Sequence, residues 1–113
     1  MDGINWADEL GVAITVSDSS GKIVYMNRKS ASTFSKQGGK SLEGTSLRDC
    51  HKPESWQKII QILETGKGNC YTIEKNGVKK MIYQAPWYED GTVAGLVELS
   101  MEIPFTMDHF IRS

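Results

Sequence analysis

The ten residues from Asp18 to Asn27 constrain the fold most, because they combine a tight turn, a strand and a helix start. Ser20-Gly21 provides a corner that tolerates positive φ, as a hairpin turn requires. The run Ile23-Val24-Tyr25-Met26 has the β-branched and aromatic composition of a buried strand. Asn27 then predicts an N-cap, because its side-chain oxygen can accept from a free N–H of a helix over residues 28–36.

The residues before this stretch predict its partner strand. Residues 12–17 alternate between apolar and smaller or polar side chains, the period of a half-buried strand, and we expect them to pair with residues 22–26 as an antiparallel hairpin. Residues 1–10 are expected to contain a short lead-in helix, with Trp6 and Leu10 on one side. The side chains of the first strand expected to face the core are Val12, Ile14 and Val16.

A longer helix is predicted from Pro53 to Gly66. Proline suits the first helical position, where its missing N–H does no harm, and Glu54 in the first turn favours the positive end of the helix dipole. Glycine at position 66 provides a C-terminal stop. Apolar side chains at helical spacing define the face expected to be buried, and they are Trp56, Ile59, Ile60 and Leu63.

Three strands follow this helix, over residues 69–75, 78–88 and 92–102. Asn76-Gly77 is a strong signal for the first hairpin, because both residues tolerate the left-handed conformation of a type I′ turn. Glu89-Asp90-Gly91 predicts the second turn. The apolar side chains expected in phase on these strands are Met81, Tyr83, Ala85 and Trp87, followed by Val93, Val97, Leu99 and Met101.

This order predicts an α+β domain with a five-stranded antiparallel sheet and helices on one face. The first strand should lie beside the last, in the middle of the sheet. A length of 113 residues suits one domain, which we place at residues 11–103. Residues 1–10 then form the lead-in helix, and residues 104–113 form a C-terminal tail or the start of a linker helix.

Composition excludes several kinds of partner. The formal net charge is −1, with 13 basic and 14 acidic residues, so there is no electrostatic footprint for nucleic acid or an anionic membrane. No apolar run approaches the roughly 18 residues of a membrane span, and the N-terminus lacks a secretion signal. Cys50 and Cys70 are too few for a disulfide scaffold and are expected to be reduced. We therefore expect a cytoplasmic chain with no membrane contact.

Several short segments, in this order and spacing, resemble a PAS domain (sensory box). The resemblance covers about residues 6–103 and rests on Gly11-Val12-Ala13-Ile14, Asp18-Ser-Ser-Gly21, Ile23 to Asn27, Gly44 with Leu47 to Glu54, and the closing strand near Leu99. It implies a small-molecule pocket between the sheet and the helices, and dimerisation through the flanking segments. It also implies a role as a sensor or signal input in larger regulatory proteins.

The adjacent residues Cys50 and His51 are open to two interpretations. In the first, they have only a structural role at the entry to the long helix, as similar motifs do in many PAS domains. In the second, they contact a ligand or take part in redox chemistry. A flavin-binding photosensor would need a motif similar to Asn-Cys-Arg-Phe, and residues 47–51 do not match it. Haem stays open only through His51, since the other histidine, His109, lies in the tail. The cofactor, if any, is therefore unknown, and no metal site is predicted.

The pocket expected from the resemblance would be lined by aromatic, apolar and a few polar side chains. The candidate ligand-binding residues are Cys50, His51, Trp56, Ile59, Tyr71, Met81, Tyr83, Val97 and Leu99. The alternative is that these side chains fill a packed core. Glu74 and Glu98 have the opposite strand parity from the apolar residues, so we expect them to face solvent.

These observations favour a PAS signal-input module that binds a small molecule between sheet and helices and regulates an attached or partner effector. The alternative is a PAS-fold homodimerisation module with a filled core and no ligand. An enzyme is not predicted, because the sequence has no nucleophile elbow, phosphate loop or paired carboxylates at helical spacing.

Overall fold

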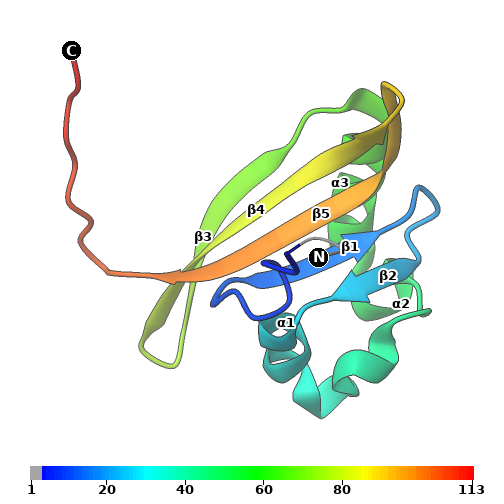
Figure 1. Cartoon of the computed structure of the whole chain (residues 1–113), viewed down its shortest axis with the longest axis horizontal. Coiled ribbons are helices and arrows are strands. Elements are labelled where there is room, and N and C mark those ends of the chain that lie inside the picture. Colours follow the sequence, from blue (N-terminus) through cyan, green and yellow to red (C-terminus); the bar gives the residue numbers. More distant parts are fainter. Residues whose placement is uncertain (1–3) are drawn as a thin grey trace.

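The computed structural model describes residues 4–113 and shows one sheet with short helical segments (Figure 1). Two strands come first, the helical segments follow, and three longer strands close the chain. The elements are β1 (Ala13–Ser17), β2 (Ile23–Met26), α1 (Arg28–Thr33), η1 (Ser35–Gln37), η2 (Gly39–Leu42), α2 (Leu47–Cys50), α3 (Pro53–Thr65), β3 (Asn69–Lys75), β4 (Val78–Glu89) and β5 (Thr92–Ile103).

The sheet has five antiparallel strands in the order β2-β1-β5-β4-β3, which confirms the predicted α+β fold. The first strand lies beside the last, and β5 is central, as expected. In Figure 1, α3 crosses behind the long strands, so one face of the sheet is covered by helix. None of the helices within residues 4–113 is both long and apolar enough to cross a bilayer.

The predicted turns and helix ends occur where the chain needs a left-handed backbone. Asn76 and Gly77 have φ values of 54° and 78°, so the hairpin between β3 and β4 uses both residues as predicted. Gly66 ends α3 at φ 75°, and its N–H donates to the Ile62 carbonyl. Pro53 lies in the first turn of α3, also as predicted.

Asp18 closes the first turn through its side chain. Its Oδ1 accepts from the Ser20 N–H at 3.0 Å, the Ser20 hydroxyl at 2.7 Å and the Lys22 N–H at 3.0 Å. The hydroxyl of Ser20 is the largest cause of a lowered pKa of Asp18, and the backbone donors add to it against a smaller opposing effect of desolvation. These donors therefore favour the ionised form of Asp18.

Asn27 connects three segments through one fully buried side chain. Its Oδ1 accepts from the Ser30 N–H at 2.9 Å, which confirms the predicted N-cap, and from the Ile14 N–H at 2.9 Å. Its Nδ2 donates to the carbonyls of Ala7 at 2.9 Å and Val12 at 2.8 Å. The helix it starts is shorter than predicted, because α1 ends at Thr33 and η1 follows.

The predicted lead-in helix is wrong for the part of residues 1–10 that the structure describes. Residues 6–9 form a turn, and residues 1–3 lie outside the described range. The carbonyls of Ala7 and Asp8 accept from Asn27 Nδ2 and the Arg28 N–H, so tertiary partners replace bonds within a helix. Residues 104–113 also contain no helix, and Figure 1 shows them leaving the body as an extended tail.

The buried core lies between the helices and the helix-covered face of the sheet. Ile59 and Ile62 of α3 are buried there, while Trp56 and Leu63 pack at its edge. The structure therefore confirms which face of α3 points toward the core, but Ile62 is buried on that face, whereas the predicted Ile60 is only half-buried. The remaining members of this core are Ile23, Met26, Leu47 and Leu96.

Strand register divides the sheet side chains between an inner face toward the helices and an outer face. Thr15 lies opposite Glu98 on the inner face, and Ile14 lies opposite Leu99 on the outer face. The expectation that Val12, Ile14 and Val16 face the core holds for the burial of Ile14, which is 6% exposed, but the register turns Ile14 and Val16 away from the helices. The inner face of β1 carries Ala13, Thr15 and Ser17, because small and polar side chains leave room for the loops and helices packed there.

Candidate functional site

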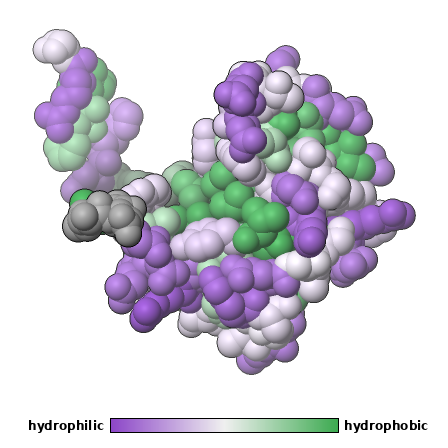
Figure 2. All heavy atoms as spheres, turned by 45° about the vertical axis from the view of Figure 1, so that its right-hand side comes forward, coloured by the Kyte–Doolittle hydropathy of each residue, from purple (hydrophilic) through white to green (hydrophobic). Residues whose placement is uncertain are grey.

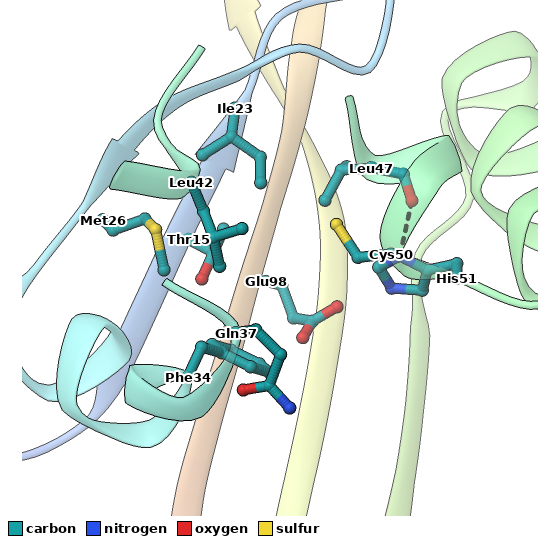
Figure 3. Close-up of a pocket in the computed structure, with 10 residues that line it drawn as sticks. All are labelled: Thr15, Ile23, Met26, Phe34, Gln37, Leu42, Leu47, Cys50, His51 and Glu98. Atoms are coloured by element: carbon teal, nitrogen blue, oxygen red, sulfur yellow. Dashed lines mark hydrogen bonds between the residues drawn. The ribbon is translucent and has the colours of Figure 1, made fainter. Parts of the chain in front are cut away.

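A cavity of about 160 Å³ lies between the inner sheet face and the short helical segments (Figure 3). Most of its wall is apolar, and its polar groups come from both layers. Ten residues line it, and they are Thr15, Ile23, Met26, Phe34, Gln37, Leu42, Leu47, Cys50, His51 and Glu98.

The helical wall of the cavity is held against the first hairpin by backbone hydrogen bonds. The Ile23 N–H donates to the Thr45 carbonyl at 2.8 Å, and the Leu47 N–H donates to the Gly21 carbonyl at 2.8 Å. The side chain of Ser46 then caps α2 by accepting from the Arg48 N–H. These bonds place α2 over the sheet, so that Leu47 and Cys50 face the cavity (Figure 3).

Glu98, at the floor of the cavity, is one end of a chain of hydrogen-bonded side chains that crosses three strands. Asn69 Nδ2 of β3 donates to Gln84 Oε1 of β4 at 3.5 Å, and Gln84 Nε2 donates to Glu98 Oε2 of β5 at 2.9 Å. Because the first bond fixes the Gln84 amide, its NH₂ group points at the carboxylate. The expectation that Glu98 faces solvent is therefore wrong, since its side chain enters the cavity (Figure 3).

His51 and Cys50 form one side of the cavity, across from Gln37 and Phe34 (Figure 3). His51 Nδ1 lies 2.8 Å from the Leu47 carbonyl, which can only accept, so Nδ1 carries a proton. In the neutral ring Nε2 is then a free acceptor.

The Cys50 thiol is poorly suited to nucleophilic chemistry. Burial raises its pKa, and the negative charges of Asp49 and Glu98 raise it further. Its Sγ contacts the Ser46 carbonyl at 3.4 Å. No cluster of three or more metal-ligating side chains occurs within residues 4–113. The geometry thus favours a contact role for Cys50 over a thiolate role.

The nine sequence-predicted site residues are distributed over both faces of the sheet. Cys50 and His51 line the cavity. Trp56 and Tyr71 lie in two neighbouring hollows that also include His51, and Ile59 is fully buried in the core. The strand register places the other four on the outer face, away from the cavity, and these are Met81, Tyr83, Val97 and Leu99.

Sequence reasoning identified only Cys50 and His51 among the ten cavity residues and missed the other eight, including the polar residues Thr15, Gln37 and Glu98. A signal for Glu98 was present, because Gln84 and Glu98 each interrupt a mainly apolar run in the middle of a strand. Only the register shows that these two residues lie opposite each other. Gln37 had no comparable signal, since it sits in the short segment η1 after α1.

The outer face of the sheet is mainly apolar although no helix covers it. Figure 2 shows hydrophobic surface on this side, bordered by polar residues. Tyr83 retains 43% of its exposed area, and Leu99 is half-buried. The apolar residues that the register aligns here are Ile14, Val16, Met81, Tyr83, Ala85, Val97, Leu99 and Met101.

The size of the cavity limits what it can hold. A cavity of about 150 Å³ is large enough for benzene, whereas pockets for drug-sized ligands measure about 300–1,000 Å³. The observed volume of about 160 Å³ therefore fits a single ring, and does not fit a flavin or a haem. Haem, left open on the sequence through His51, has no room here.

Comparison with solved structures shows the same fold in bacterial sensor domains. A sensory box sensor histidine kinase from Vibrio cholerae is 20% identical, with a TM-score of 0.64, over 87% of this chain and 86% of that chain. The PAS domain of a protein from Colwellia psychrerythraea is also 20% identical, with a TM-score of 0.64, over 87% and 91% of the two chains.

The Vibrio cholerae protein VqmA, in a structure bound to DPO, is 16% identical to this chain with a TM-score of 0.68. The match covers 89% of this chain and 56% of that chain, so this chain spans about half the length of VqmA. No protein-family model matches the sequence, and no curated protein gives a significant match.

The sheet order, the helical segments on one face and these structural neighbours together define a PAS fold. The chain has the fold of a sensory domain, as found in sensor histidine kinases.

Proposed function

We propose that this chain is a PAS signal-input module that binds a small molecule in the cavity between sheet and helices. The single observation that carries the proposal is the cavity itself, which has apolar walls and a polar floor ending at Glu98. The structural likeness to VqmA, which has been seen bound to DPO, supports it. The module has no catalytic role in this proposal, and we place it in the cytoplasm as one part of a regulatory protein.

A bound ligand would contact the least regular part of the fold. Phe34, Gln37 and Leu42 come from the end of α1 and the two 3-10 segments, and Cys50 comes from the four-residue helix α2. Short helical segments have few internal bonds and depend on packing for stability. Ligand binding therefore favours one arrangement of this wall, and the attached or partner effector responds to that shift in population.

Native mass spectrometry and thermal unfolding of the full chain, with and without a panel of single-ring metabolites, test this proposal. We expect a retained or added mass and a higher Tm for at least one compound. Cys50→Phe should abolish the Tm increase by filling the cavity, whereas Cys70→Phe, on the outer face, should preserve it. A panel with no added mass and no Tm change would refute ligand sensing.

A second candidate function is homodimerisation through the outer face, which its partly exposed apolar side chains favour. Tyr83 and Tyr71 offer a matched pair, because they are 43% and 42% exposed on opposite faces of the sheet. Sedimentation measurements should show that Tyr83→Lys weakens the dimer about tenfold or more, while Tyr71→Lys does not. A chain that stays monomeric at millimolar concentration would exclude this function.

A further inference from the structure

The cavity contains a carboxylate that forms no ion pair with any residue in the range 4–113. Glu98 is the one acidic residue among the ten that line it, and no lysine or arginine lines it. Within residues 4–113 the ion pairs involve Asp8, Glu9 and Glu43, so none reaches Glu98. Among the described residues, its one hydrogen-bond partner is the neutral amide of Gln84 at 2.9 Å. A carboxylate at the end of an apolar cavity gains most from a charged donor.

Several polar groups around Glu98 are already engaged, and the groups left for a ligand include the His51 Nε2 acceptor and the Gln37 amide, which can both donate and accept. Asn69 holds the Gln84 amide so that its one donor group is used on Glu98 Oε2. Thr15 and Ser30 pair their hydroxyls at 2.6 Å. With Nδ1 of His51 occupied by the Leu47 carbonyl, Nε2 of the neutral ring remains as an acceptor.

Glu98 acts as a negative charge on two neighbouring groups. The charge of Glu98 contributes to the raised pKa of the Cys50 thiol, after burial and Asp49, and to the raised pKa of Tyr71, after burial. Two basic side chains, Arg48 and Lys58, line the neighbouring hollows that share His51 and are not among the residues of the cavity. An anion entering the cavity would therefore meet a like charge without a compensating cation.

We propose that the ligand is a small organic cation, a single-ring or similarly sized amine whose N–H group donates to Glu98. This inference rests on the proposed ligand-binding function and narrows it to one chemical class. The ring packs against the apolar wall near Phe34, Leu42 and Met26, and the ammonium group reaches the floor at Glu98 (Figure 3). The cavity volume of about 160 Å³ limits the ligand to about the size of one ring with a short substituent.

Three probes of nearly equal size separate charge from shape, namely benzylamine, benzyl alcohol and benzoate. Calorimetric titration of the full chain at pH 7 should show benzylamine binding at least about tenfold more tightly than either of the others, as expected for a charge-assisted hydrogen bond. Glu98→Gln keeps the side-chain shape and should remove this preference, leaving benzyl alcohol affinity within about threefold. Unfolding of the variant without ligand checks that it is folded.

The outcomes distinguish this inference from the proposed function. Equal or tighter binding of benzyl alcohol or benzoate would overturn the cation inference, while the cavity would still be a ligand site. Failure of benzylamine to bind would also overturn it, even if another compound of the metabolite panel binds. If neither the panel nor these probes bind, both proposals fall. The selectivity of the unaltered chain decides the matter even if Glu98→Gln does not fold.

Discussion

Replacing Asn27 by alanine should cost more stability than almost any other single polar substitution in the described chain. The side chain is fully buried and makes four hydrogen bonds, two as acceptor and two as donor. Asn27→Ala leaves the buried N–H groups of Ile14 and Ser30 without partners, and each unsatisfied group costs about 1–3 kcal/mol. The carbonyls of Ala7 and Val12 are less enclosed and can turn to water.

The expected loss is therefore about 3–5 kcal/mol, a large part of the 5–15 kcal/mol typical of a domain. It should appear as a lower urea midpoint with an unchanged m-value, followed by tryptophan fluorescence and circular dichroism, and as a Tm lowered by at least about 12 °C. Asn5→Ala, at an exposed position, is the control and should change stability by less than about 0.5 kcal/mol.

Asn27→Asp separates the two halves of the side chain. The aspartate retains the acceptor for Ile14 and Ser30 but presents a second acceptor, and a buried charge, to the Ala7 and Val12 carbonyls. Burial raises the folded-state pKa of such a carboxyl, so the loss of stability caused by Asn27→Asp should shrink as pH falls from 7 toward 4.

A loss of unfolding free energy below about 1 kcal/mol for Asn27→Ala would refute the idea that this side chain organises the fold.

Three further predictions concern other parts of the chain. Gly95→Ala should destabilise by about 3 kcal/mol or more in urea unfolding, because its Cβ would lie 1.8 Å from a backbone oxygen, whereas Gly11→Ala, with nothing within 4 Å, should be nearly neutral. The pKa of Asp18 is lowered from 3.8, so its ionised form stabilises the fold above that pH. The difference in unfolding free energy between the unaltered chain and Asp18→Asn should shrink as pH falls below about 4, and a difference that does not change with pH would contradict this. The pKa of the Cys50 thiol is raised, so less of the reactive thiolate is present in the folded chain. In a Cys70→Ser variant at pH 8, iodoacetamide should therefore alkylate Cys50 more slowly in the folded chain than in the urea-unfolded chain, and equal rates would count against the structure.

Local signals in the sequence predicted most of the fold. Asn27 as a helix cap, Asn76-Gly77 as a hairpin and Gly66 as a helix end each depend on the chemistry of one or two residues, and each is confirmed. The lead-in helix failed because its carbonyls bind Asn27 and Arg28, partners about twenty residues away. No local pattern reports such bonds.

The candidate site was harder to predict because, in the middle of β4 and β5, polar side chains face the helices and apolar side chains face away from them. Alternation correctly grouped Tyr83 with Leu99, but the usual assumption that the apolar face meets the helices placed them in the pocket. The polar residues Gln84 and Glu98 face the helices instead, and Glu98, bonded to Gln84, enters the cavity. Sequence parity gives the grouping of side chains on a strand, and only tertiary structure shows which group faces inward.

The hydrogen bonds of Asn27 also make a mechanical connection. A pull on the chain before Ala7 acts on Asn27 Nδ2, and the same side chain holds the first turn of α1 through the Ser30 N–H. The Ser30 hydroxyl in turn contacts Thr15 on the cavity wall at 2.6 Å. Three hydrogen bonds, from Ala7 to Asn27, from Asn27 to Ser30 and from Ser30 to Thr15, thus connect the N-terminal segment to the cavity wall. A displacement of the N-terminal segment would act on the cavity through these bonds.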